Sequence, residues 1–305
     1  MKVMVIDTVG GDRFGKRYRK FFPKVKLSGY EMSNQGTCQP HGYQCGYYAG
    51  VLLNNVPGDH ELIFVRNFDG RGNWVRGSED WMLDLIEKHR PDIVTRSWGQ
   101  HDGDSAYGES MGTRGWAQWA EEFKRLQGVL GFVDFGAAGN DDVNDADNDI
   151  AFPQRLMGGF SNVIGSHRRD GVPSKFSGDG HGVQCVLWGE NILLNSNGIW
   201  ERGSGTSFSC PKAAGLCAAL GLLHEEWGEY VQENATKPEG WTGDIPHPKW
   251  GYGSLEYRYQ EKLAALGMTA PHLLPPYIAP ARLQAKREWF DREQVLCEKD
   301  TQRNS

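Results

Sequence analysis

No apolar run in the 305-residue sequence approaches the roughly 20 residues needed to span a membrane. A secretory signal is missing as well, because the apolar residues from position 2 onward read as a short strand that the fold itself uses. Internal repeats and low-complexity tracts are also absent. We therefore expect neither a membrane protein nor a repeat protein, and we expect no folding prosegment ahead of the first strand.

An excess of basic charge is likewise missing: 33 Lys and Arg residues against 39 Asp and Glu residues give a formal net charge of −6. Nucleic-acid-binding proteins usually present a basic patch, so we expect no nucleic-acid partner. Basic residues gather only between positions 13 and 26. We interpret that stretch as a solvated surface, with a docking patch for an acidic partner as the weaker alternative.

Cysteine is scarce, with six residues in the chain. Cys45, Cys210 and Cys217 lie in segments with helical spacing of small and apolar residues, where a free thiol behaves as a small hydrophobic group. Free thiols are typical of reducing compartments. The cysteines therefore favour an intracellular, cytoplasmic setting over a disulfide-bonded one.

The chain length allows one large core rather than two equal domains. We expect one domain over residues 1–265, followed by a linker and a charged helical arm over residues 266–305. The arm either packs back on the domain or binds a protein partner.

The segment Gly205–Pro211 is the most informative in the chain. It places Ser207 at the start of an apolar helical run, and Pro211 is expected in the first turn of that helix. A hydroxyl there lies beside free backbone N–H groups and the positive end of the helix dipole. Those conditions suit a nucleophile whose reaction forms an oxyanion. An ordinary serine near a helix N-terminus is the alternative.

A serine nucleophile needs a base, and the base needs an orienting group. His41 precedes a run of small and apolar residues at helical spacing, which predicts a buried helix that begins beside it. Asp7 ends an apolar segment typical of a strand buried in a parallel sheet. The carboxyl end of such a strand is where open α/β sheets place their functional crevice. A dinucleotide fold is disfavoured, because no Gly-x-Gly-x-x-Gly follows the strand.

The order Asp7, His41, Ser207 and the residues around each position resemble the subtilisin-like serine proteases (subtilases, peptidase S8 type). The resemblance implies a three-layer α/β fold with a central, mostly parallel sheet and helices on both faces. It also implies a serine endopeptidase that hydrolyses peptide bonds through an Asp-His-Ser triad and an acyl-enzyme. No cofactor is needed for that chemistry.

Two further segments match the family. The first ends in Ser97, Trp98 and Gly99, which resemble the strand that pairs with an extended peptide substrate. The second ends in Ala137, Ala138, Gly139 and Asn140; the first three resemble substrate-binding residues, and Asn140 resembles the side-chain donor of the oxyanion hole.

By the same resemblance, residues 141–153 border the pocket for the residue before the cut. Asp141 is expected at its rim and Ala151 near its floor. A carboxylate at the rim favours a Lys or Arg there by charge pairing.

Tyr43 and Gln44 replace the small residue and second histidine that usually follow the family's His-Gly. A bulky Tyr43 narrows the site or displaces the base. Two alternatives to a general endopeptidase therefore stay open: an inactive peptide-binding or scaffold homologue, and a dedicated maturation protease or transpeptidase.

An acidic loop follows Asn140. Asp145, Asp147 and Asp149 alternate as in a calcium-binding loop, but the Gly and distal Glu of the EF-hand pattern are missing. A solvated acidic loop is the preferred interpretation, with Ca²⁺ as the alternative.

Overall fold

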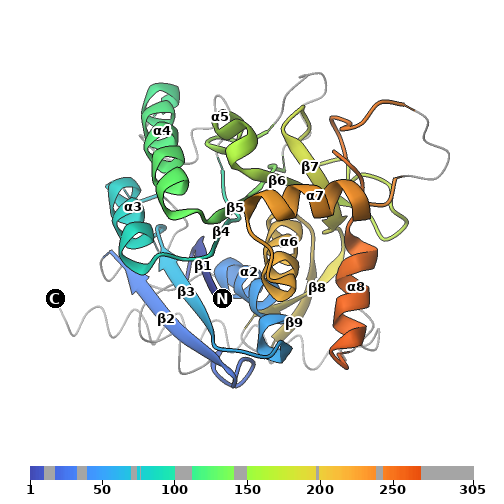
Figure 1. Cartoon of the computed structure of the whole chain (residues 1–305), viewed down its shortest axis with the longest axis horizontal. Helices are drawn as coiled ribbons and strands as arrows, with labels where there is room; N and C mark the ends of the chain where they lie inside the picture. Colours follow the sequence, from blue (N-terminus) through green and yellow to red (C-terminus); the bar gives the residue numbers. More distant parts are fainter. Residues whose placement is uncertain are drawn as a thin grey trace.

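The computed structural model describes residues 1–9, 18–32, 40–69, 74–75, 77–99, 112–140, 150–196, 199–237 and 243–268. Its centre is a seven-stranded sheet in the order β2-β3-β1-β4-β5-β6-β7, in which every pair of neighbours is parallel (Figure 1). The strands are β1 (Lys2–Asp7), β2 (Val25–Glu31), β3 (His60–Arg66), β4 (Ile93–Arg96), β5 (Val133–Ala137), β6 (Asn162–His167) and β7 (Val183–Trp188).

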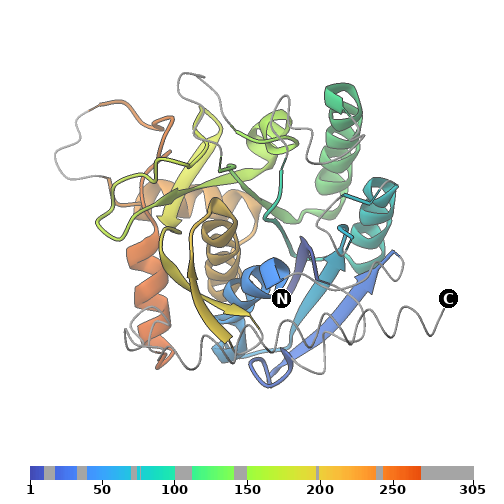
Figure 2. The same ribbon diagram turned by 180° about the vertical axis from the view of Figure 1, so that it is seen from behind.

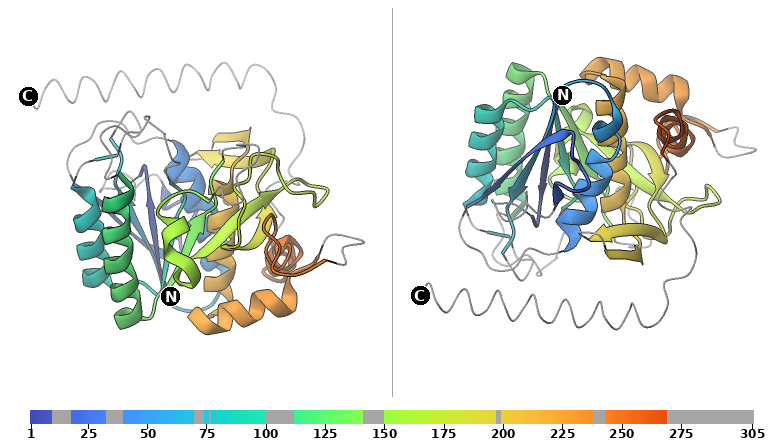
Figure 3. Two further views of the ribbon diagram at one scale, coloured as in Figure 1. Left: turned by 90° about the horizontal axis from the view of Figure 1, so that it is seen from above. Right: turned by 90° about the horizontal axis from the view of Figure 1, so that it is seen from below.

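Helices cover both faces of this sheet, which gives the three layers seen in Figure 3. On one side lie α3 (Ser78–His89) and α4 (Gly112–Leu130), and on the other lie α2 (Pro40–Gly50) and α6 (Thr206–Leu220). The side of α2 and α6 is extended by α7 (His224–Asn234) and α8 (Glu256–Ala265). The predicted fold class is confirmed.

β1 shows how the sequence produces two cores. Val3 and Val5 face α2 and α6, whereas Met4 and Ile6 face α3 and α4, and all four are at most 1 % exposed. Successive side chains of a strand point to opposite faces, so a continuously apolar strand is the one that can be covered on both.

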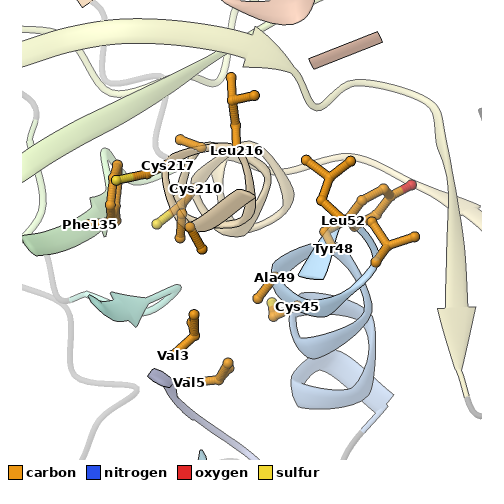
Figure 4. Packing of buried hydrophobic residues seen from close by; sticks show 14 of the residues in the cluster. Val3, Val5, Cys45, Tyr48, Ala49, Leu52, Phe135, Cys210, Leu216 and Cys217 are labelled. Atoms are coloured by element: carbon orange, nitrogen blue, oxygen red, sulfur yellow. The ribbon is translucent and has the colours of Figure 1, made fainter. Parts of the chain in front are cut away.

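Every residue of α6 except Leu220 is buried, which makes it the central helix of its layer. Figure 4 shows Cys210 and Cys217 on the sheet side of α6, with α2 alongside and Val3 and Val5 of β1 beneath. Close approach of α2 and α6 needs Gly215, because a Cβ there would lie 2.7 Å from the Tyr48 carbonyl oxygen.

The remaining elements are short. They are η1 (Leu53–Asn55), α5 (Gln154–Met157), η3 (Gly158–Phe160), and the antiparallel pair β8 (Ile192–Ser196) and β9 (Ile199–Gly203). Figure 2 shows this pair apart from the main sheet and next to α2. The Tyr48 hydroxyl of α2 donates to the Leu193 carbonyl of β8.

α3 and α4 are amphipathic helices whose apolar sides pack in the core on their face of the sheet. The aromatic side chains of α4 are packing residues: Trp116, Trp119 and Phe123 are at most 3 % exposed. Among the described residues Cys45, Cys185, Cys210 and Cys217 are free and buried. Residues 269–305 lie outside the described residues, so the C-terminal arm stays a prediction.

Within the described ranges no single helix is both long and apolar enough to cross a membrane. In the same part of the chain one pair of consecutive helices, α6 and α7, has the length and composition of a membrane span when taken together, but a bend of 107° separates them.

The strand order places the functional region. The chain runs from β1 to the edge strand β2, comes back to β3 beside β1, and then crosses to β4 on the other side of β1. Ligands of open α/β sheets bind beyond the carboxyl ends of the strands where the order reverses in this way. Asp7 ends β1 and Ser97 follows β4, so both lie at that edge.

Candidate active site

Asp7 and His41 are joined by a hydrogen bond of 2.8 Å between Asp7 Oδ1 and His41 Nδ1. Asp7 is 1 % exposed, whereas the His41 side chain is 33 % exposed. Asp7 Oδ1 also accepts the Thr8 N–H at 2.7 Å. The bond fixes which ring nitrogen faces the carboxylate and leaves His41 Nε2 on the far side of the ring.

The end of β1 also positions the start of α2, which carries His41. Thr8 Oγ1 accepts the Gly42 N–H at 2.9 Å. A Cβ on Gly42 would lie 2.7 Å from the Val9 nitrogen, so a larger residue would force the two segments apart. The glycine after His41 is therefore a packing requirement.

Burial pulls the pKa of His41 down, but the charge of Asp7 and the hydrogen bond to it together outweigh burial. The pKa of His41 is raised above its ordinary value of 6.5. A base whose pKa lies close to the working pH is both available and effective as a proton acceptor.

Ser207 is the second residue of α6, so its N–H belongs to the first turn, where no intrahelical acceptor exists. The side chain is buried, and its hydroxyl donates to the Ser97 carbonyl at 3.0 Å. The Phe208 ring lies 5.6 Å from the His41 ring. The described residues thus place His41 and the start of α6 together, with the Ser207 hydroxyl bonded to Ser97 and not to His41.

Pro211 was expected in the first turn of the helix, but the structure places it further along. The helix begins at Thr206, so Pro211 is inside it and lacks the N–H that would bond the Ser207 carbonyl four residues earlier. The Cys45 thiol donates to that carbonyl instead, at 3.3 Å. Burial, reinforced by the charge of Asp7, raises the pKa of Cys45 well above 9.0, so the thiol keeps its proton.

The Asn140 amide is held by Thr206, the first residue of α6. Asn140 Oδ1 accepts the Thr206 N–H at 2.8 Å and lies 3.0 Å from Thr206 Oγ1. Anchoring the amide through its oxygen leaves both N–H groups of Nδ2 available. Asn140 is exposed, and Nδ2 lies beside Gly205, two residues before Ser207.

Residues 97–99 and 137–139, called the lining segments below, extend from neighbouring strands β4 and β5. Gly99 and Gly139 are partly exposed, and Ser97, Ala137 and Ala138 are buried. The Trp98 side chain is 7 % exposed and packs among the core aromatics of α4, so only its backbone belongs to the lining. Ala151 N–H donates to the Ala138 carbonyl at 2.9 Å, which attaches the predicted floor residue to one segment.

The subtilase family model matches residues 16–235, well over half of the chain. The chain belongs to the subtilase family. The match includes His41, Asn140 and Ser207, whereas Asp7 precedes it. The protein is accordingly a subtilisin-like serine protease, a hydrolase that acts on peptide or protein substrates.

Solved structures similar to this subtilase carry low sequence identity and show the shared fold. The prenylagaramide maturation protease PagA has a TM-score of 0.60 at 19% identity, covering 88% of this chain and 94% of its own. A lanthipeptide protease has a TM-score of 0.64 at 15% identity, covering 87% of each chain. A mutant of the protease domain of PatA has a TM-score of 0.59 at 20% identity, covering 88% of this chain and 97% of its own. No curated protein sequence matches this one.

Sequence reasoning missed three residues whose contacts shape the site of this subtilase. Thr206 holds the Asn140 amide, Cys45 bonds the Ser207 carbonyl, and Gln154 Nε2 lies 2.6 Å from the Trp98 carbonyl and 3.1 Å from the Ala137 carbonyl. Only Cys45 left a signal in the sequence, four residues after His41 on the same helix face.

Tyr43 does not displace the base of this subtilase. Its ring packs on Tyr18 at 5.5 Å between centroids, and the Tyr18 hydroxyl donates to the Tyr43 carbonyl. The Gln44 side chain donates to Glu201 Oε1 of β9 at 2.8 Å. His41 meanwhile keeps its bond to Asp7.

Asp141, Asp145, Asp147 and Asp149 lie outside the described residues, so the rim carboxylate and the calcium candidates stay predictions. Among the described residues, Asp7, His41 and Cys45 are grouped closely enough to hold a metal ion, with ligand atoms within 4.8 Å of one another. A thiol is a metal ligand as its thiolate, and the raised pKa of Cys45 opposes that form. The short Asp7–His41 contact favours a hydrogen-bonded pair.

Proposed function

We propose that this subtilase is an endopeptidase in which Asp7, His41 and Ser207 form a catalytic triad. The observation that carries the proposal is the buried Asp7 carboxylate bound to His41 Nδ1, beside the helix start that presents Ser207. Asp7 holds the imidazole in the tautomer that has Nε2 free, and it stabilises the imidazolium that forms.

In the proposed reaction Ser207 Oγ bonds to the scissile carbonyl carbon while its proton passes to His41 Nε2. The C–N bond then breaks, and the departing amine takes that proton from His41. A water molecule then adds to the acyl-enzyme carbonyl while His41 takes its proton, and His41 returns that proton to Ser207 Oγ as the carboxylic acid leaves. The hydroxyl must first leave the Ser97 carbonyl by rotating about the Cα–Cβ bond of Ser207.

We further propose that the oxyanion is received by the Ser207 N–H and by Asn140 Nδ2. The anchoring of Asn140 Oδ1 by Thr206 supports this role, since a donor fixed before the reaction costs no reorganisation when charge develops. An extended substrate would add as a strand along Ser97, Trp98 and Gly99. No cofactor takes part.

The experiment is active-site labelling with a small fluorophosphonate, followed by mass spectrometry of the labelled peptide. Wild type should be labelled at Ser207, and Ser207→Ala should lose both label and peptide hydrolysis while its thermal unfolding is unchanged. Ser209→Ala is the matched control, because Ser209 is a buried serine of the same helix whose hydroxyl bonds the Leu187 carbonyl. It should keep the label. A wild type that stays unlabelled would identify an inactive homologue.

A dedicated maturation protease is a second candidate, and the solved relatives favour it. Two of them are described as a maturation protease and a lanthipeptide protease. Labelling of Ser207 combined with no cleavage of casein would support such restricted use. Efficient cleavage of casein at many sites would contradict it.

A further inference from the structure

We propose that this subtilase cuts after small residues (Gly, Ala or Ser), because Ala151 and Gln154 close the space between the lining segments. The inference rests on the proposed function, since it concerns the residue before the cut at the same site. It departs from the Lys or Arg preference expected from Asp141.

The floor is tied to both lining segments. Ala151 N–H donates to the Ala138 carbonyl at 2.9 Å, on the β5 side. Three residues later, Gln154 Nε2 donates to the Trp98 carbonyl at 2.6 Å, on the β4 side, and to the Ala137 carbonyl at 3.1 Å. One amide group thus bridges the two segments and fixes their separation.

On the β4 side, Gly99 lies directly against this floor. A Cβ placed on Gly99 would lie 2.5 Å from the Ala151 Cβ and 3.0 Å from the Phe152 carbonyl oxygen. Gly99 and Ala151 are therefore already in contact, with no room for a carbon atom between them. Ala151 is 1 % exposed and Ala138 is fully buried.

Gln154 packs just as closely against Gly136 of β5. A Cβ on Gly136 would lie 2.3 Å from Gln154 Cγ. Gln154 is itself 1 % exposed, and its Oε1 has no hydrogen-bond partner among the described residues. The side chain is wedged in place by packing and by its two donated bonds.

A large side chain before the cut could enter only if this floor moved. An aromatic side chain buries about 150–250 Å², and the bridge from Gln154 to Trp98 and Ala137 would have to break to admit it. A single methylene too many in a tight apolar pocket changes the specificity constant by about 10–200-fold. Small residues avoid that cost, and the backbone contacts of the bound strand supply the affinity.

The test uses a series of peptidyl phosphonates that differ only in the residue bonded to phosphorus: Ala, Val, Leu, Phe or Lys analogues. We expect the Ala analogue to inactivate wild type at least about tenfold faster than the Leu analogue and about a hundredfold faster than the Phe and Lys analogues. Faster inactivation by the Phe, Leu or Lys analogue would overturn the inference.

Two variants identify the residues responsible. Ala151→Gly should raise the Val-to-Ala and Leu-to-Ala rate ratios by about tenfold, and Gln154→Ala should raise the Phe-to-Ala ratio. Gln127→Ala is the matched control, because Gln127 is also a buried glutamine whose amide donates to a backbone carbonyl (that of Phe132, at 3.1 Å), here on α4. It should leave all ratios unchanged.

The outcomes separate the two proposals. A small fluorophosphonate carries no side chain before the cut, so it reports on Ser207 alone. If it labels Ser207 while Ala151→Gly leaves the phosphonate ratios unchanged, the size-selection inference fails and the triad stands. If it labels nothing, both fail. Should Gln154→Ala not fold, the wild-type profile and Ala151→Gly still decide.

Discussion

The Cys45 thiol donates to the Ser207 carbonyl at 3.3 Å, and so takes the place of the helix N–H that Pro211 lacks. The same sulfur lies 3.8 Å from His41 Nδ1. One side chain therefore links the helix of the proposed base to the helix of the proposed nucleophile.

Cys45→Ala should lower the free energy of unfolding by about 1–3 kcal/mol, because it leaves a buried carbonyl without a donor. The loss should shrink by about 1 kcal/mol in a Pro211→Ala background, where residue 211 regains an N–H for Ser207. Denaturant unfolding of the four proteins in this cycle measures the coupling. Cys185→Ala, which removes a buried thiol that makes no hydrogen bond among the described residues, is the packing control. If Cys45→Ala lowers the free energy of unfolding equally in both backgrounds, the thiol does not act as the donor that replaces the missing N–H of residue 211.

The pH profile of kcat/KM should follow the neutral form of His41. Since Asp7 raises the pKa of His41 above 6.5, the active form accumulates only as pH rises through a midpoint above that value. In Asp7→Asn the contributions that raise the pKa are lost and burial remains, so the midpoint should move to lower pH, with activity reduced by about 10⁴-fold. An NMR titration of His41 in the Ser207→Ala background gives the midpoint directly. A midpoint that Asp7→Asn does not move would contradict the assignment.

Asn140→Ala should reduce kcat by about 10²–10³-fold with little change in KM, the size of effect found for the oxyanion asparagine of subtilisin. Asn140→Asp tests whether Asn140 acts as a hydrogen-bond donor to the oxyanion or only as an acceptor that holds Thr206. It keeps an oxygen acceptor for Thr206 but has no N–H, so it should be at least as inactive as Asn140→Ala. If Asn140→Asp keeps wild-type kcat, the residue serves only to hold Thr206.

Breaking the buried ion pair of Arg96 and Asp134 should destabilise the fold. The two side chains are fully buried and joined by bonds of 2.9 and 2.5 Å. Asp134→Ala leaves the Arg96 charge unpaired and should cost about 3–5 kcal/mol in denaturant unfolding. Glu122→Ala is the control, because it breaks an exposed pair with Arg125 and should leave the unfolding midpoint unchanged. Equal effects of the two variants would contradict this account.

Much of the fold was predictable because its signals are local. The unbroken apolar run before Asp7 indicates a strand covered on both faces, and the stripe that includes Trp116, Trp119 and Phe123 indicates an amphipathic helix. The family resemblance supplied the three-layer arrangement. The helix start at residue 206 was placed too late, since Pro211 was assigned to a first turn that in fact begins earlier.

What could not be predicted depends on contacts between segments far apart in the chain. Gln154 reads as an ordinary polar residue after a proline, and its role comes from two carbonyls, at residues 98 and 137, that meet only in the folded sheet. The bond from Ser207 to the Ser97 carbonyl depends in the same way on the docking of α6 against β4.

Because α6 is the buried centre of its layer and lies late in the chain, the order of synthesis has a consequence. A growing polypeptide carries Asp7 and His41 long before the ribosome adds Ser207, and Cys45 and Ser207 are 162 positions apart. Nascent chains up to that point contain the proposed base without the proposed nucleophile, and their hydrophobic layer lacks its central helix. The proposed nucleophile and the central helix of this layer therefore join the chain in one late stretch, so neither the site nor the layer can assemble before most of the protein has been made.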